Sequence, residues 1–262
     1  MKTTWYRTAA LILEQDDFRL AVDPFVAMTP LGISDEARHK SETADLLKKV
    51  DAVLVTHGHF DHIYDIPALF ADGDQMIYAT KTPCGTLLKN GIKSERLARV
   101  TPGDTLCIGP FEIDVYQGRH CRFDFGVARQ TLLRKSAVTY LSKLMRLWRL
   151  NKAYPENQET AFYEIRAEGK RLQLMGSMGM DETVDYPAAA DALILPFQGT
   201  GDPAKTVAPI VAALKPKRIL LDHYDDAFPP LSSQVRTDDF VVRMNGKGIL
   251  TEAMESGKGY EI

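Results

Sequence analysis

The chain has 262 residues, of which 45% are hydrophobic and 26% are charged. These proportions are ordinary for a soluble globular protein, and a chain of this length buries enough surface to fold without disulfide staples. The formal net charge of -3 gives no overall attraction to nucleic acid, so we expect no nucleic-acid partner.

Three further features indicate the compartment. The three cysteines, Cys84, Cys107 and Cys121, show no CxxC spacing and are typical of thiols in a reducing environment. The N-terminus lacks the apolar core of a signal peptide, and no apolar run is long enough to span a bilayer. We therefore expect a cytoplasmic protein with no stable membrane insertion.

The predicted elements begin with a β-hairpin and continue with strands and helices in alternation. Two apolar runs at 9–13 and 18–22 are separated by a polar turn, and a charged helix follows from an N-cap at Ser34 to Lys49. A buried strand at 51–55 then leads into a group of histidines. Downstream we expect strands at 76–79, within 99–116, within 162–175, at 192–196 and at 218–222, with helices at 84–89 and near 206–214.

This arrangement predicts an α/β sandwich of two mixed β-sheets with helices outside, formed by a single domain over 1–262.

One segment stands apart from this pattern of strands and helices. From Val127 to Lys152 there are seven basic residues and no acidic one, while leucines and Trp148 recur at spacings of three and four. We expect a basic amphipathic helical insertion at about 127–152. It could simply pack its apolar side on the domain, cover the site as a lid, lie on an acidic membrane surface, or contact a second subunit in a homo-oligomer.

The run Thr56-His57-Gly58-His59-Phe60-Asp61-His62 carries the strongest chemical signal. His57 and His59 are two residues apart after a strand, so their side chains project to the same side in extended backbone. Asp61 and His62 follow where the chain turns into a helix. Four ligand-type residues within six positions predict one or two metal ions. Imidazole-rich sites of this kind favour Zn²⁺ over Mn²⁺ or Fe²⁺.

His-x-His-x-Asp-His after an apolar strand resembles the metallo-β-lactamase superfamily. Other landmarks of that family follow in its order along the chain, namely Asp23 at a strand end, His120 after Gly118-Arg119, and His223 after a late strand. The resemblance implies the four-layer αββα sandwich. It also implies that His57, His59 and His120 hold one metal ion, and that Asp61, His62 and His223 hold a second.

The resemblance further implies a water or hydroxide between the ions as the nucleophile. Asp61 could orient this water, and Asp23 would support the histidine loop. A bound divalent ion lowers the pKa of water from about 15.7 to about 7, which makes hydroxide available at neutral pH.

One departure from the family pattern concerns the second ion. Ser177, in Met175-Gly176-Ser177, stands where the family has an aspartate that bridges the two metals. A hydroxyl is a poorer ligand than a carboxylate, so we expect the second ion to bind more weakly. The site would also keep one more positive charge, which favours an anionic substrate. Asp181 is four residues away, and we do not expect it to compensate.

Other titratable residues receive less specific interpretations. His39 lies in a charged helix and is expected to be a solvated surface residue. Cys121 follows His120 directly and should point away from the metal. Asp225 and Asp226 could support His223 from behind, or could be ordinary loop carboxylates that cap a helix.

These residues predict a metal-dependent hydrolase acting on an ester, lactone, amide or phosphoester bond of a small substrate. The absent secretion signal argues against a β-lactamase, and the missing basic charge argues against a nuclease. The alternative is a non-catalytic metal-binding sensor or accessory protein, which the substitution at Ser177 favours.

Overall fold

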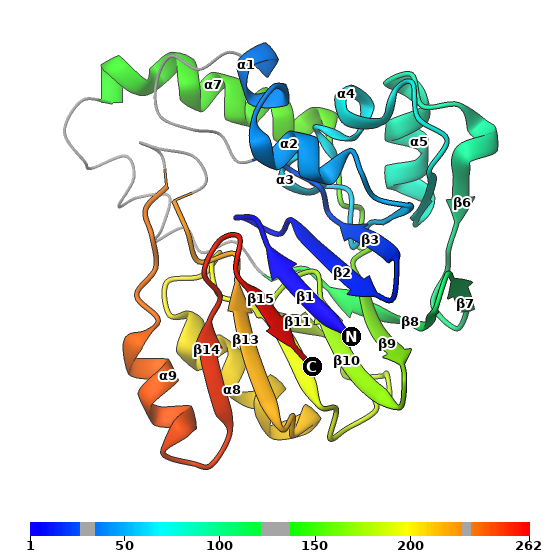
Figure 1. Cartoon of the computed structure of the whole chain (residues 1–262). Helices are drawn as coiled ribbons and strands as arrows, with labels where there is room; N and C mark the ends of the chain where they lie inside the picture. Colours follow the sequence, from blue (N-terminus) through cyan, green and yellow to red (C-terminus); the bar gives the residue numbers. More distant parts are fainter. Residues whose placement is uncertain (27–34, 122–136, 227–231) are drawn as a thin grey trace.

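The computed structural model describes residues 1–26, 35–121, 137–226 and 232–262. Two mixed β-sheets pack face to face, and helices lie on the outside (Figure 1). This confirms the predicted α/β sandwich. In the described part of the chain, no helix combines the length and the apolar character that crossing a bilayer requires. The single domain over 1–262 stays a prediction.

The first sheet has antiparallel strands at one side and parallel strands at the other. The antiparallel pairs join β15, β1, β2 and β3, and the parallel pairs join β3, β4, β5 and β6. In sheet order the strands are β15 (Gly259–Glu261), β1 (Lys2–Trp5), β2 (Leu11–Gln15), β3 (Phe18–Val22), β4 (Ala52–Leu54), β5 (Met76–Ala79) and β6 (Leu97–Arg99).

The second sheet repeats this arrangement. Strands β11, β8, β9 and β10 pair antiparallel, β7 pairs antiparallel with β8, and β10, β12, β13 and β14 are parallel. Their bounds are β7 (Thr105–Ile108), β8 (Phe111–Arg119), β9 (Ala161–Ala167), β10 (Lys170–Met175), β11 (Gly179–Met180), β12 (Ala192–Pro196), β13 (Arg218–Asp222) and β14 (Leu250–Ala253).

The helices cover the outer faces of the sheets. On the first sheet lie α1 (Asp35–His39), α2 (Glu42–Leu47), α3 (Phe60–Ile63), α4 (Ile66–Phe70), α5 (Lys81–Lys89) and α7 (Ala137–Ala153), with a 3-10 turn at Ser94–Arg96. On the second lie α8 (Pro203–Leu214) and α9 (Asp238–Asn245).

Three layers of buried side chains hold the four structural layers together. Successive strand residues point to opposite faces of a sheet. In β4, accordingly, Leu54 enters the core between the sheets, whereas Val53 enters the core under the helices. In β12, Ile194 faces the other sheet and Leu193 faces α8 and α9. Each sheet is therefore apolar on both faces where helices cover it.

The predicted strands and helices recur, some with the predicted bounds and others with shifted ends. The strands at 18–22, 76–79, 192–196 and 218–222 coincide with β3, β5, β12 and β13. The single helix expected to Lys49 is instead two helices, because Ser41 begins α2 by accepting a hydrogen bond from the Ala44 N–H at 3.2 Å. The N-cap proposed at Ser34 lies outside the described residues. Sequence reasoning missed β1, α4, β11, α9, β14 and β15.

Candidate metal centre

The proposed ligands meet at one edge of the sandwich because they follow strands that end there. His57 follows β4 of the first sheet, and α3 next to it carries Asp61 and His62. His120 follows β8 and His223 follows β13 of the second sheet. Strands β8, β10, β12 and β13 all run in the same direction, so their carboxyl ends share an edge.

Two groups of three ligand atoms result, each with its atoms within 4.8 Å of one another. The first group is His57, His59 and His120, and the second is Asp61, His62 and His223. These are the two sets that the sequence resemblance implied. The structure brings them together, and their role as metal ligands stays a prediction.

In the first group, two ring nitrogens face each other. His57 Nε2 lies 3.2 Å from His59 Nδ1. Two nitrogens bound to one tetrahedral Zn²⁺ at about 2.0–2.1 Å would be about 3.3 Å apart. The spacing therefore fits a shared ion.

Asp23 determines how the ring of His62 is protonated. Its Oδ2 accepts from the Thr56 hydroxyl at 2.5 Å and lies 2.7 Å from His62 Nδ1, while Oδ1 accepts from the Thr56 N–H at 2.8 Å. All three residues are buried. A carboxylate accepts only, so His62 carries its proton on Nδ1 and keeps a lone pair on Nε2. These contacts favour the supporting role expected for Asp23, which stays a prediction.

Thr56 is a residue that sequence reasoning missed, although it lies inside the motif. Its hydroxyl donates to Asp23, so it can accept from His57 Nδ1, which lies 3.1 Å away. This leaves the His57 Nε2 lone pair directed at His59. A Cβ on Gly176 would collide with the Thr56 side chain, so the end of β10 approaches the end of β4 closely here.

His120 and Ser177 are joined through Cys121. His120 Nδ1 donates to the Cys121 carbonyl oxygen at 2.8 Å, which leaves Nε2 for a ligand. The Cys121 N–H donates to Ser177 Oγ at 3.0 Å. Ser177 thus lies beside the first group, with its hydroxyl oxygen already accepting one hydrogen bond.

His223 has a backbone conformation that is uncommon for histidine, with φ of 50°. Its N–H donates to the Thr8 carbonyl at 3.0 Å, so the turn between β1 and β2 holds it. Its Nε2 lies 3.3 Å from Asp61 Oδ2. Its buried Nδ1 has no hydrogen-bond partner among the described residues. A strained residue at a strand end is typical of a functional site.

Burial and mutual proximity shift the pKa values of the group. Burial, with His62 nearby, lowers the pKa of His57 well below its usual range, and burial lowers that of His59 to about 4. Burial alone would lower the pKa of His223, but the hydrogen bond to Asp61 raises it to about 9.

Burial alone would raise the pKa of Asp61, but His62 and the hydrogen bond from His223 hold it well below its usual range. At neutral pH, His57 and His59 are therefore uncharged and can each offer a nitrogen lone pair to a metal ion. Asp61 is an anion paired with a protonated His223. A cation in the second group would replace the proton of His223.

The remaining predicted residues lie outside the two groups. His39 is not a solvated surface residue, since its side chain is 21% exposed and its Nε2 lies 2.8 Å from the buried Asp65. Asp225 accepts from the Thr8 N–H at 2.9 Å and supports the turn that holds His223. Asp226 accepts from the Ser232 hydroxyl. Asp181 pairs with Arg119 at 3.0 Å.

The family of the chain follows from a comparison with known families. The model of the beta-lactamase superfamily domain matches residues 19–224. The chain belongs to the metallo-β-lactamase superfamily. The matched span begins in β3 and contains all six proposed ligands.

Relatives of this superfamily member are named metal-dependent hydrolases. A UPF0173 metal-dependent hydrolase of Azorhizobium caulinodans is 30% identical over 46% of the chain. That match spans about half of the relative's length, 49%. A protein of the same description from Anoxybacillus flavithermus is 24% identical over 98% of the chain and 99% of its own length.

Solved structures share the fold. Igni18, a metallo hydrolase from Ignicoccus hospitalis, has a TM-score of 0.67 at 19% identity, covering 100% of this chain and 98% of its own. Zn²⁺-bound PqqB from Methylobacterium extorquens has a TM-score of 0.57 at 15% identity, covering 97% and 87%. The metallo-beta-lactamase fold protein YhfI from Bacillus subtilis has a TM-score of 0.63 at 17% identity, covering 100% of this chain and 98% of its own, which confirms the metallo-β-lactamase fold.

Proposed function

We propose that the protein is a zinc-dependent hydrolase that cleaves an ester, lactone, amide or phosphoester bond in a small anionic substrate. The observation that carries the proposal is the meeting of two three-ligand groups at one edge of the sandwich. Membership of a superfamily with relatives named metal-dependent hydrolases supports it.

The donor set fits zinc. Five imidazoles and one carboxylate supply the six ligand atoms. Hydrogen bonds to Thr56, Asp23 and the Cys121 carbonyl fix the tautomers of His57, His62 and His120. Manganese and magnesium favour sites richer in oxygen. When bound, such ions lower the pKa of water and polarise the substrate carbonyl or phosphoryl oxygen.

The protein residues then bind and orient the reactants. Asp61 is ionised, so its carboxylate can accept a hydrogen bond from the attacking water and direct a lone pair at the substrate. Asp61 is the only anion among the six proposed ligands. With Ser177 in place of a carboxylate, two divalent ions would leave a net positive site, which favours an anionic substrate.

The experiment measures metal and turnover on the same samples. Purified protein should contain one to two equivalents of zinc, and a panel of phosphodiesters, lactones, amides and thioesters should include a substrate that it cleaves. His59→Ala should lose zinc and abolish the turnover. His39→Ala is the matched control, because His39 is the sixth histidine and lies outside both groups. Hydrolysis would be refuted if the wild type cleaved no substrate of the panel, or if His59→Ala retained the cleavage activity that the wild type shows.

The same measurement distinguishes the second candidate, a metal-binding sensor or accessory protein without turnover. Ser177 is the observation that favours it, since a bridging carboxylate is absent from the position the family uses. The expected result for a sensor is zinc content equal to that of a hydrolase, no cleavage across the panel, and loss of zinc in His59→Ala.

A further inference from the structure

The outer face of α7 combines large apolar side chains with cations. Met145 is 47% exposed and Trp148 is 64% exposed, and Arg149 and Lys152 are exposed beside them. These four residues are at positions i, i+3, i+4 and i+7, so they share one face of the helix. The Lys152 ammonium lies 5.5 Å from the centre of the Trp148 ring.

The opposite face of α7 holds the helix on the protein. Leu147 and Leu150 pack against the core under the helices of the first sheet. The sequence predicted Trp148 on this apolar face, and that prediction is wrong, because Leu147 and Leu150 occupy it and Trp148 is turned toward solvent. Most of the apolar area of Trp148 is therefore open to solvent in the described protein.

The end of α7 also lies against the histidine loop. The ring of Tyr154, directly after α7, lies 5.7 Å from that of Tyr64 next to α3. A Cβ on Gly58, between His57 and His59, would collide with the Pro155 carbonyl oxygen. Whatever binds the outer face of α7 is thus held near the candidate metal centre.

The charge of this face is of one sign. Between 127 and 152 the sequence contains no acidic residue, and no ion pair with Arg149 or Lys152 occurs among the described residues. Helix α9 provides a contrast at the opposite end of the molecule (Figure 1). It also exposes an apolar side chain, Val242, at 72%, but Asp238 and Asp239 begin the helix.

We propose that the outer face of α7 binds the surface of an anionic lipid bilayer without crossing it. Tryptophan favours the boundary between headgroups and acyl chains, where its ring is partly buried. Each basic residue close to an anionic bilayer raises the partition coefficient of a protein between water and the bilayer surface roughly fivefold. A face with Trp148 and Met145 beside Arg149 and Lys152 meets both requirements, and the face itself carries no acidic side chain that an anionic bilayer would repel. The proposal does not rest on the proposed hydrolysis.

Vesicle sedimentation tests the proposal. The full-length protein is mixed with vesicles of equal parts phosphatidylcholine and phosphatidylglycerol, with EDTA present so that divalent ions do not bridge protein and lipid. At about 50 mM NaCl, where surface charge is weakly screened, the protein should sediment with these vesicles and not with pure phosphatidylcholine. Arg149→Glu/Lys152→Glu should lower the partition coefficient at least tenfold. Arg243→Glu/Lys247→Glu, with one residue on α9 and one just after it, is the matched control and should change the partition coefficient less than twofold.

Fluorescence gives a second readout that does not depend on charge reversal. The protein has two tryptophans, and Trp5 is buried at 2% exposure. Binding to anionic vesicles should shift the emission of the wild type to shorter wavelength, and Trp148→Phe should remove the shift.

Three results would overturn the proposal. In the first, the wild type stays in solution with anionic vesicles. In the second, the charge-reversed α7 variant binds them as well as the wild type does. In the third, the protein self-associates or binds soluble heparin through Arg149 and Lys152 but ignores vesicles, which would assign the face to a second subunit or to a polyanion.

Discussion

At the scale of single residues, the buried carboxylate of Asp23 decides which nitrogen of His62 can bind a metal. Its Oδ2 faces two donors, the Thr56 hydroxyl and His62 Nδ1. An amide in the same place brings its NH2 group or its single oxygen to that position. If the NH2 group faces His62, the ring must move its proton to Nε2, and the metal-facing lone pair is lost.

Asp23→Asn should therefore weaken metal binding by roughly 10–100-fold, the usual effect of removing a partner behind a metal-ligating histidine. Zinc titration with a competing chelator measures this change. Asp51→Asn is a suitable control, because Asp51 is near the other end of β4 and accepts from the Arg19 N–H at 2.7 Å. Equal affinities in the two variants would show that Asp23 does not orient a ligand.

Ser177 gives a second prediction at this scale. Its Oγ accepts the Cys121 N–H, next to the ligand His120. A carboxylate at this position can accept the same hydrogen bond with one oxygen and bind an ion with the other. Ser177→Asp should then tighten the second zinc ion at least about tenfold, since an anionic ligand replaces a neutral hydroxyl. Calorimetric titration resolves the two binding steps, and unchanged stoichiometry and affinity would contradict the prediction.

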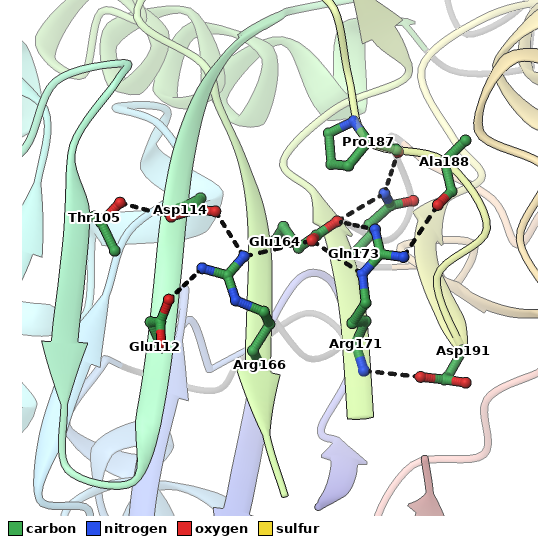
Figure 2. Close-up of polar contacts among 10 residues, drawn as sticks. All are labelled: Thr105, Glu112, Asp114, Glu164, Arg166, Arg171, Gln173, Pro187, Ala188 and Asp191. Atoms are coloured by element: carbon green, nitrogen blue, oxygen red, sulfur yellow. Dashed lines mark hydrogen bonds and ion pairs between the residues drawn. The ribbon is translucent and has the colours of Figure 1, made fainter. Parts of the chain in front are cut away.

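At the scale of secondary structure elements, the outer face of the second sheet carries a ladder of charged side chains away from the metal centre. Figure 2 shows it across β7, β8, β9 and β10. Glu164 on β9 accepts from Arg171 at 2.9 Å and from Gln173 at 3.2 Å, and Arg166 contacts Asp114 at 2.6 Å. The Glu164 side chain is only 5% exposed.

Because Glu164 is buried, its removal leaves Arg171 and the fully buried Gln173 with unpaired donors. Glu164→Ala should lower the free energy of unfolding by roughly 2–3 kcal/mol, less than for a wholly buried ion pair because its arginine partners are partly exposed. Glu112 also binds Arg166, at 2.6 Å, but its side chain is 56% exposed. Glu112→Ala should cost less than about 1 kcal/mol. Urea unfolding compares them, and equal losses would contradict this reasoning.

The elements that the sequence predicted are those with a strong local pattern. Strands β12 and β13 are continuous apolar runs, and their predicted bounds coincide with the structure. In contrast, β1, Lys2–Trp5, is mostly polar and becomes a strand because it pairs with β2 and β15. Its Trp5 and the Tyr260 of β15 enter the core between the sheets. Such strands depend on partners distant in sequence, which a local pattern does not contain.

At the scale of the whole molecule, the candidate site was predictable in two unequal parts. The spacing of His57, His59 and His62 is local and by itself indicated a metal. His120 and His223 are far from it in sequence, and only the order of strands in the sheets brings them to the same edge. They entered through resemblance to the superfamily. The contacts of Thr56 with Asp23 and of Thr8 with His223 could not be predicted, because they depend on the pairing of β3 with β4 and on the place of the β1–β2 turn.

The ligand groups also join the two sheets, so metal binding should stabilise the whole fold. The first group takes His57 and His59 from the first sheet and His120 from the second, and the second group likewise takes His223 from the second sheet. An ion at about 1,000 times its Kd adds about 4 kcal/mol, provided that the unfolded chain does not bind it. For a chain of this length that is a rise in Tm of roughly 8–16 °C.

Calorimetry with zinc and with EDTA measures the rise in Tm. In His120→Ala/His223→Ala the first sheet alone would hold the ions, so most of the rise should disappear, whereas His39→Ala should keep it. A full rise in the double variant would show that the ions do not bind between the sheets.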